Sequence, residues 1–234
     1  PLADALIDQG AEVVLLPMVA IVDPTDGGAA LAAAAARLGD YDRIVVTSPN
    51  GACRLLDVAG NLPVADWPPV AAIGPATAGP LQAAGAPVDL VPGEAVAESL
   101  LNALPDPPDD GGRLLLVRAE SAREILPAGL VAAGWDLEVV AAYRNVEPAV
   151  EGPVLDEART AEAVTFTAAS VVRRYHDLAG GPRPVDALCI GPISGGLARN
   201  LGFRTAEANP HSVSGLVEAA CRWARSRGGF RRLS

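Results

Sequence analysis

Small and hydroxyl-bearing residues follow four short apolar runs, each time just before an alanine-rich stretch. They form the turns Thr47-Ser48-Pro49-Asn50, Gly74-Pro75-Ala76-Thr77, Thr167-Ala168-Ala169-Ser170 and Gly191-Pro192-Ile193-Ser194. A strand that ends in such a turn leads into a helix whose first N–H groups are unpaired and carry roughly half a positive charge. Ser, Thr and Asn also act as ordinary N-caps, but the paired repetition favours a binding role. We expect these turns, facing each other across a hinge, to hold a ligand with several carboxylates.

Two other residues stand where they could add chemistry. Tyr143 is one of only three tyrosines and lies in a short extended segment. Its hydroxyl could donate a proton to a ligand, or the ring could simply pack between domains. Arg118 ends an apolar run, where it either binds a carboxylate or lies at the surface. We favour the binding role for Arg118 and assign Tyr143 as a candidate proton donor.

The charged residues exclude several function classes. All 18 basic residues are arginine, so no lysine is present for a P-loop, a Schiff base or a general base. The formal net charge of -10 argues against a wide nucleic-acid footprint or an anionic membrane surface, because clustered cations drive both. Five arginines between Arg222 and Arg232 are the local exception, and we interpret them as a solvated helix end.

Cysteine and histidine are too few and too scattered for a metal site. The three cysteines show no CxxC spacing and the chain has two histidines, so neither a disulfide framework nor a zinc site is expected. The sequence also contains no GxSxG, HExxH or P-loop motif. We expect a reduced, cytoplasmic protein without a metal, in which substrate geometry matters more than covalent catalysis.

Apolar runs that alternate with alanine-rich stretches are typical of βα units around a parallel sheet. The expected strands are 12–16, 43–47, 70–73, 87–91, 113–117, 136–141, 163–166, 186–190 and 203–207. The expected helices are 1–9, 28–38, 50–59, 75–84, 95–104, 121–133, 153–160, 168–179, 192–200 and 212–226.

The sequence contains an internal repeat. The run that ends at Thr47 is echoed at Thr167, the Gly74-Pro75 turn at Gly191-Pro192, and later helices match in the same order. The last element of the second copy lies at the other end of the chain, where residues 10–15 resemble residues 134–139. We therefore expect two similar parallel-sheet α/β domains, a continuous one over 24–141 and a discontinuous one assembled from 1–17 and 148–234.

This arrangement needs two chain crossings, which we place at 18–23 and 142–147. Adjacent connections usually lie side by side, so we expect the crossings to pair as a two-stranded linker. The repeat also predicts a strand upstream of Pro1, as the counterpart of residues 114–118.

Taken together, these motifs resemble the uroporphyrinogen-III synthase family. The resemblance is carried by Val46-Thr47-Ser48-Pro49-Asn50, Ile73-Gly74-Pro75-Ala76-Thr77-Ala78, Ala97-Glu98-Ser99-Leu100, Tyr143-Arg144, Thr165-Phe166-Thr167, Ile190-Gly191-Pro192 and Gly215-Leu216-Val217. It implies two α/β domains joined by a two-stranded linker. It also implies a cofactor-free lyase of tetrapyrrole biosynthesis, which dehydrates and cyclises hydroxymethylbilane with inversion of the last pyrrole ring.

The resemblance further assigns roles to residues. The helix N-termini around Thr47, Ser48, Thr77, Thr167, Ser170 and Ser194 would bind acetate and propionate groups, and Tyr143 would assist loss of the hydroxyl. The sequence departs from the family at Ala168, where a serine usually follows the threonine, and at Ile193-Ser194, where Thr-Ala is common. The family's opening strand, with its Val-Thr-Arg-Pro turn, has no match.

A second function remains open, a catalytically inactive synthase-like domain that senses a ligand or regulates. The intact Tyr143 and hydroxyl set favour the enzyme. A periplasmic-type binding protein would also cross twice between domains, but it would carry a signal peptide, which this sequence does not show. We expect a monomer that receives hydroxymethylbilane from hydroxymethylbilane synthase and binds neither nucleic acid nor membrane.

Overall fold

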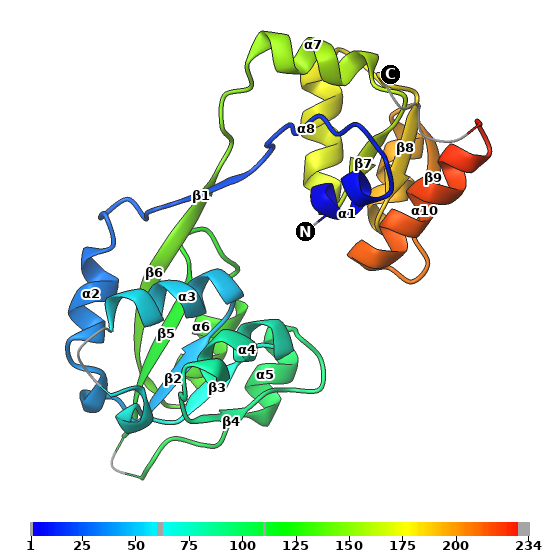
Figure 1. The fold of residues 1–234 in the computed structure, drawn as a ribbon. Helices are drawn as coiled ribbons and strands as arrows, with labels where there is room; N and C mark the ends of the chain where they lie inside the picture. The colour runs from blue at the N-terminus through cyan, green and yellow to red at the C-terminus, as the bar shows by residue number, and fades with distance from the viewer. Residues whose placement is uncertain (1, 60–62, 110, 229–234) are drawn as a thin grey trace. The chain divides into compact units, whose positions relative to one another are not determined.

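The computed structural model describes residues 2–59, 63–109 and 111–228, and it divides into two compact units (Figure 1). Unit 1 comprises Pro1–Ala20 together with Glu147–Ser234, and unit 2 comprises Ile21–Val146. Each unit contains one sheet, and every strand pair with a defined register runs parallel. The expected fold class, two α/β domains of which one is discontinuous, is confirmed.

Unit 2 is built on a six-stranded sheet with the order β1-β6-β5-β2-β3-β4. Its strands are β1 (Ala20–Val22), β2 (Arg43–Val46), β3 (Val70–Ala72), β4 (Val88–Leu90), β5 (Arg113–Ala119) and β6 (Asp136–Val146). Its helices are α2 (Ala29–Ala35), α3 (Pro49–Val58), α4 (Pro75–Ala83), α5 (Ala97–Ala103) and α6 (Ile125–Ala132), with 3₁₀ turns η1 (Leu38–Asp40) and η2 (Val64–Asp66).

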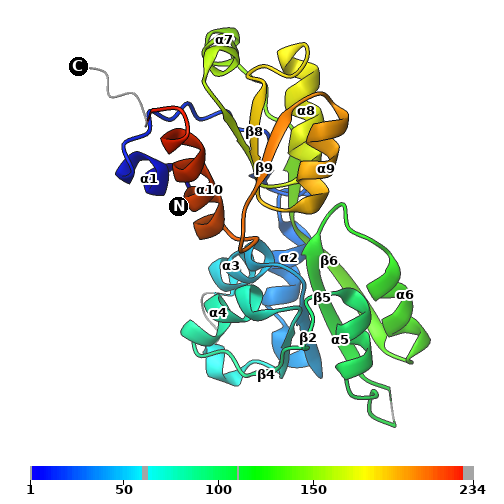
Figure 2. The same cartoon turned by 90° about the vertical axis from the view of Figure 1, so that its right-hand side faces the viewer.

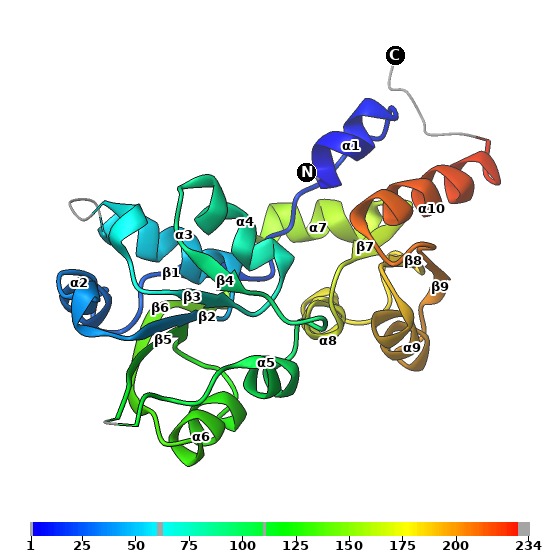
Figure 3. The ribbon, with the colours of Figure 1, turned by 90° about the horizontal axis from the view of Figure 1, so that it is seen from below.

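The sheet of unit 2 is covered on both faces, as Figure 3 shows. Helices α2, α3 and α4 cover one face, and α5 and α6 cover the other. Strand β5 lies at the centre, where Leu115 and Val117 face the first layer and Leu114 and Leu116 face the second. All four side chains are fully buried, which is why this strand reads as a continuous apolar run.

Unit 1 has a three-stranded sheet with the order β7-β8-β9. Its elements are α1 (Leu2–Asp8), α7 (Gly152–Thr160), β7 (Val164–Phe166), α8 (Ala169–Ala179), β8 (Asp186–Cys189), α9 (Pro192–Asn200), β9 (Arg204–Glu207) and α10 (Val213–Arg225). Helices α8 and α9 cover one face of this sheet, and α1 and α10 cover the other (Figure 2). The two units thus share the same three-layer plan.

Two expected elements differ from the structure. Residues 12–16 are not a strand, because residues 11–19 carry no regular secondary structure. Strand β6 is longer than the expected 136–141, because it continues through the second crossing to Val146. The first crossing contributes β1, which lies next to β6 in the sheet. The linker strands are therefore part of the sheet of unit 2.

Candidate functional site

The two Gly-Pro turns have the same geometry in both units. Gly74 and Gly191 are extended N-cap residues with φ of -174° and -169°, and each is followed by a proline at the start of α4 or α9. The second helical residue is exposed, and Ile193 reaches 80%. Proline lacks an N–H, so the first free donor of each helix is the backbone N–H of this exposed residue. Each turn therefore presents a backbone donor and a helix dipole to an anion.

The third residue of each turn is a buried hydroxyl, but the two hydroxyls differ in their partners. Thr77 is 2% exposed and Ser194 is 3% exposed. The Ser194 hydroxyl donates to the Gly191 carbonyl oxygen at 3.0 Å, so its proton is already used within the turn. The Thr77 hydroxyl forms no hydrogen bond within residues 2–59, 63–109 and 111–228. Thr77 is thus the freer of the two expected hydroxyl donors.

The turn after β2 combines an N-cap with a side chain bound to the neighbouring strand. The Ser48 hydroxyl accepts a hydrogen bond from the Gly51 N–H at 3.0 Å and caps α3. Thr47 donates twice to the Val117 carbonyl, from its backbone N–H at 3.2 Å and its hydroxyl at 3.3 Å. Ser48 keeps its own O–H proton for a ligand, and half-buried Asn50 adds a first-turn N–H.

The corresponding turn after β7 is more open. Thr167, Ala168 and Ser170 are exposed, and Ala169 is half-buried. Ala168 is the N-cap of α8 and supplies no side-chain cap, so the first-turn N–H groups of this helix are not satisfied by a capping side chain. Ala168 and Ala169 can contact a ligand through backbone N–H groups, while Thr167 and Ser170 add exposed hydroxyls.

Arg118 lies at the end of β5 and is only 7% exposed. One of its terminal nitrogens, Nη2, donates to the Ala122 carbonyl at 2.7 Å and to the Glu124 carboxylate at 2.8 Å. The Glu124 side chain is 79% exposed, whereas that of Arg118 is 8% exposed. The sequence placed Arg118 at a strand end but missed Glu124, because a carboxylate six positions away in a loop carries no periodic signal. The Glu124 carboxylate thus already uses one of the hydrogen-bond donors of the Arg118 guanidinium.

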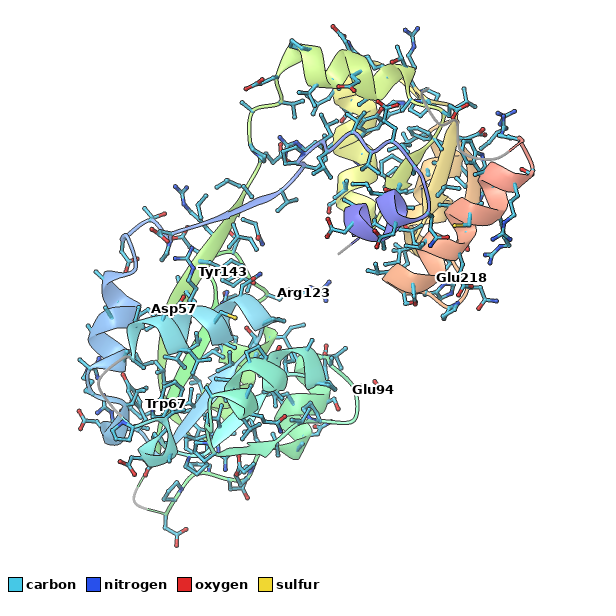
Figure 4. The ribbon with its side chains drawn as sticks, viewed as in Figure 1. Asp57, Trp67, Glu94, Arg123, Tyr143 and Glu218 are labelled. Carbon is cyan, nitrogen blue, oxygen red and sulfur yellow. The ribbon has the colours of Figure 1, made fainter. Side chains whose placement is uncertain are left out.

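Tyr143 lies on β6 in the core of unit 2, and Figure 4 shows it there with Arg123 on the segment after β5. It is 7% exposed, and its carbonyl accepts the Glu120 N–H at 2.8 Å. Within the part of the chain that the structure describes, the Tyr143 hydroxyl has no hydrogen-bond partner. A tyrosine with a buried ring and an unengaged hydroxyl has a proton that it can donate to a ligand.

The parallel register brings three candidate groups to the same edge of unit 2. Val46 pairs with Val117 and Ala119 pairs with Tyr143, so Thr47, Arg118 and Tyr143 lie at the carboxyl ends of adjacent strands. The Gly74 turn follows β3, whose Ala72 also pairs with Val46. Ligands of parallel α/β sheets bind at this edge. The structure thus places these four candidates in unit 2 together and those of unit 1 at the equivalent edge of their own sheet.

The thiol nearest the Gly191 turn is neutral. Burial, together with the Glu207 carboxylate, raises the pKa of Cys189 to about 11. Cys189 therefore adds no negative charge close to a turn that is expected to bind an anion.

Sequence reasoning also missed the arginines that hold the two crossings. In unit 2, Arg144 donates to the Asp23 carbonyl at 3.1 Å, and Arg54 pairs with the Asp23 carboxylate. In unit 1, the Arg174 side chain donates to the carbonyls of Met18 and Pro148. Contacts to backbone carbonyls depend on the fold and leave no pattern in the sequence.

The described residues form neither a metal site nor a membrane-spanning helix. No group of three or more His, Cys, Asp or Glu side chains in this part of the chain could hold a metal ion. No helix among these residues combines the length and the apolar character that crossing a bilayer requires.

Comparison with known proteins connects this geometry to one family. The sequence matches the family described as uroporphyrinogen-III synthase HemD over residues 1–218. It is 30% identical to the uroporphyrinogen-III synthase of Synechococcus elongatus over 242 residues, covering 96% of this chain and 91% of the relative. It is 33% identical to a putative uroporphyrinogen-III synthase of Methanothermobacter thermautotrophicus over 165 residues, and this match spans 64% of each chain.

Solved structures with the same fold carry the same name. A mutant uroporphyrinogen III synthase from Thermus thermophilus matches with a TM-score of 0.60 and 21% identity, covering 96% of this chain and 94% of that one. The uroporphyrinogen-III synthetase of Helicobacter pylori matches with a TM-score of 0.62 and 18% identity, covering 88% and 91%. By its sequence match over residues 1–218, this chain belongs to the uroporphyrinogen-III synthase family.

Proposed function

We propose that this protein is a uroporphyrinogen-III synthase. It would act as a lyase that removes water from linear hydroxymethylbilane, inverts the D ring and closes the macrocycle to uroporphyrinogen III. Besides family membership, one observation carries the proposal. The Gly-Pro turns of both units present the same extended glycine, exposed second residue and buried third hydroxyl. A substrate with many carboxylates requires several such anion-binding turns, because each turn can bind one carboxylate.

In this proposal the helix N-termini bind the acetate and propionate groups. In unit 2 the donors are the backbone N–H groups of Asn50 and Ala76 and the hydroxyls of Ser48 and Thr77. In unit 1 the donors are the residues Thr167 to Ser170 and the backbone N–H of Ile193. The Ser194 hydroxyl instead stabilises its own turn by donating to the Gly191 carbonyl. Fixing several carboxylates holds the linear chain in a geometry close to ring closure, which removes much of the entropic cost.

Tyr143 is the proposed general acid. Its hydroxyl would donate a proton to the departing hydroxyl of the substrate, so that the carbon–oxygen bond breaks and water leaves. The carbon that lost its hydroxyl bonds to the substituted α-carbon of ring D and gives a spiro intermediate. The bond from that α-carbon to the neighbouring methylene then breaks, the methylene bonds to the free α-carbon of the same ring, and the proton displaced there returns the tyrosinate to tyrosine. The proton count balances over the cycle, and one water is released. Among the residues that the structure describes, the Tyr143 hydroxyl has no hydrogen-bond partner, and this supports the role.

A coupled assay tests the reaction. Hydroxymethylbilane is generated with its synthase, this protein is added, and the products are oxidised and separated as porphyrin isomers by chromatography. The expected result is a shift from the spontaneous type I isomer to type III. A reaction without this protein gives the type I baseline, and circular dichroism shows that the added protein is folded.

The same assay separates the enzyme from an inactive ligand-sensing domain. A folded protein that yields only the type I isomer, yet binds the products or the substrate in a thermal-shift titration, would contradict the enzyme and support the sensor. We also propose that the protein acts as a cytoplasmic monomer that receives its substrate from hydroxymethylbilane synthase. Gel filtration of the two proteins alone and mixed tests both points.

A further inference from the structure

Glu120, the residue directly after β5, connects three segments of unit 2. Its backbone N–H donates to the Tyr143 carbonyl of β6 at 2.8 Å. Its carboxylate accepts two further hydrogen bonds from Thr25, one from the backbone N–H at 2.8 Å and one from the hydroxyl at 3.0 Å. Thr25 lies between β1 and α2, 95 positions away in the sequence. One residue therefore ties the loop before α2 to the backbone of Tyr143.

The ladder between β5 and β6 is irregular just before this contact. Arg118 pairs with Ala141, whereas the next residue, Ala119, pairs with Tyr143. Ala142 therefore has no counterpart on β5. Side chains alternate between the two faces of a regular strand, yet the neighbours Ala142 and Tyr143 both pack in the same core cluster. An extra residue of this kind redirects the side chains near it, so the irregularity affects where the Tyr143 ring points.

The Tyr143 hydroxyl does not fix the ring. It has no hydrogen-bond partner among the described residues, so the ring is oriented by its packing and by the backbone that carries it. On the side of β5, the regular register ends at the irregularity, and the bond from the Glu120 N–H comes directly after it. A group that holds Glu120 in place therefore also holds Tyr143 in place.

The loop that contains Thr25 is fixed from two other directions. Arg144 of β6 donates to the Asp23 carbonyl at 3.1 Å, and Arg54 of α3 pairs with the Asp23 carboxylate. Asp23 lies two residues before Thr25, so β6 and α3 both hold this loop. The Glu120 carboxylate is therefore bound to a loop that is itself anchored.

The contact between Glu120 and Thr25 affects position more than stability. Both residues are exposed, and hydrogen bonds of exposed carboxylates add little to the free energy of folding, because water competes for the same groups. Both carboxylate oxygens accept from Thr25, so the side chain is already engaged within the protein. By contrast, displacing a catalytic group by about 1 Å can lower a rate about 10²-fold.

We propose that Glu120 is a positioning residue for Tyr143. It holds the Tyr143 carbonyl through its own N–H, while Thr25 holds its carboxylate. This brace fixes the backbone at the irregularity of β6 and so aims the phenol at the departing hydroxyl of the substrate. The role in the reaction rests on the proposed function, in which Tyr143 donates the proton, whereas the brace itself can be measured without substrate.

The first test measures the brace without any reaction. Amide hydrogen exchange is followed by NMR in the parent and in Glu120→Ala. The amide of residue 120 should lose at least about tenfold of its protection in the variant, because its bond to the Tyr143 carbonyl opens more often. The Thr47 amide, which donates to the Val117 carbonyl on the other side of β5, is the internal control and should keep its protection. Unchanged protection at residue 120 would overturn the proposal.

The second test uses the coupled assay. Glu120→Ala should lower kcat about tenfold or more and leave KM within about twofold of the parent, with a melting temperature within about 2 °C. Asp57→Ala is the matched control and should keep the parent kcat. It removes an exposed carboxylate of α3 that has no ion pair or hydrogen bond within the described residues. A parent-like kcat in Glu120→Ala would contradict the proposal.

Glu120→Gln separates position from charge. Its amide oxygen still accepts from the Thr25 N–H, and its NH₂ group can donate to the Thr25 hydroxyl. This variant should therefore retain at least about a third of the parent kcat. A kcat as low as that of Glu120→Ala would mean that the negative charge itself acts, which a positioning role does not allow.

A double variant shows whether Glu120 acts through Tyr143. In the Tyr143→Phe background, Glu120→Ala should change kcat by less than about twofold, because no hydroxyl remains to be positioned. Additive losses would overturn the proposal. If the folded parent gives only the type I isomer, the proposed function fails, while hydrogen exchange still decides whether Glu120 holds the backbone of Tyr143.

Discussion

At the scale of single residues, equivalent positions in the two units have different uses. Thr77 and Ser194 occupy the same place in their turns and are equally buried. The Thr77 hydroxyl has no partner in the described part of the chain, whereas the Ser194 hydroxyl donates to the Gly191 carbonyl. The sequence predicted both positions as hydroxyl donors, but it could not predict the difference, because a bond to a nearby carbonyl depends on side-chain rotation.

This difference predicts opposite effects of two matched substitutions. Thr77→Val removes a hydroxyl that forms no hydrogen bond to the described residues, so the free energy of unfolding should change by less than about 0.5 kcal/mol while KM rises. Ser194→Ala removes a buried hydrogen bond and should lower the free energy of unfolding by about 1 kcal/mol, with a smaller change in KM. Urea denaturation and the coupled assay measure the two quantities. Equal stability losses would contradict the assignment.

Tyr143→Phe tests the proposed proton donor. The hydroxyl contributes no hydrogen bond in the described structure, so the melting temperature should stay within about 2 °C of the parent. Loss of a general acid should lower kcat by about 10²-fold or more, with little change in KM. Steady-state kinetics with the type III isomer as the readout measure both constants. Wild-type kcat in a folded Tyr143→Phe variant would show that another group supplies the proton.

Glu124→Gln tests whether Arg118 binds substrate. The exposed Glu124 carboxylate engages Arg118, so removing its charge should free the guanidinium for a substrate carboxylate. Exposed ion pairs contribute little, and KM should fall by no more than about fivefold. Glu94→Gln is the control, because it makes the same charge change at a residue with no ion pair among the described residues. An equal KM effect of both variants would point to net charge instead.

At the scale of elements, apolar patterning predicted strands well wherever a partner strand is present. The eight expected strands from 43–47 onward all appear, at nearly the expected bounds. Residues 12–16 have the apolar pattern of a strand, yet they pair with no strand among the described residues. The pattern of apolar residues predicts which side chains are buried, but a strand also requires hydrogen-bond partners for its backbone. The continuation of β6 to Val146 agrees with the expected pairing of the two crossings, because β1 lies next to β6 in the sheet.

The start of α4 depends on a glycine for steric reasons. A Cβ on Gly74 would lie 2.8 Å from the Cβ of Ala95, although the φ of -174° is open to any residue. Gly74→Ala should therefore lower the free energy of unfolding by about 1–3 kcal/mol. Gly79→Ala in the same helix meets nothing within 4 Å and should raise it by up to about 1 kcal/mol. Denaturant titrations measure the free energy of unfolding of both variants. An unchanged value for Gly74→Ala would contradict the close packing of Gly74 against Ala95.

Asp186 ties α10 to the sheet of unit 1 and makes this contact pH-dependent. Burial acts to raise the pKa of Asp186, but hydrogen bonds from Arg204 and Trp223 outweigh it and hold the pKa below its usual value. Because the pKa of Asp186 is lower in the folded state, its carboxylate stabilises the folded protein at pH values above the unfolded pKa of about 3.9. This stabilisation is lost as the pH falls through the folded pKa. Asp186→Asn should therefore destabilise at pH 7 and approach the parent below about pH 4. A pH-independent difference in melting temperature would contradict this.

At the scale of the whole molecule, net charge opposes the proposed substrate. A protein of formal charge -10 repels an anion with several carboxylates at long range, even where local turns attract it. Moderate salt screens the repulsion over about 10 Å at 0.1 M. The value of kcat/KM should therefore rise between low and moderate salt, measured at constant pH with the coupling enzyme in excess. A steep fall would indicate that arginines near the turns dominate the encounter.

The discontinuous unit has a consequence for the order of synthesis. Unit 2 is one uninterrupted stretch, so it can fold as soon as it leaves the ribosome. Helix α1 packs through Leu6 against Leu216 and Ala220 of α10, which are translated roughly 10 to 40 seconds later at ordinary elongation rates. During that interval the apolar face of α1 has no native partner. Helix α1 can therefore complete its native packing only after α10 has been made, so unit 1 finishes folding later than unit 2.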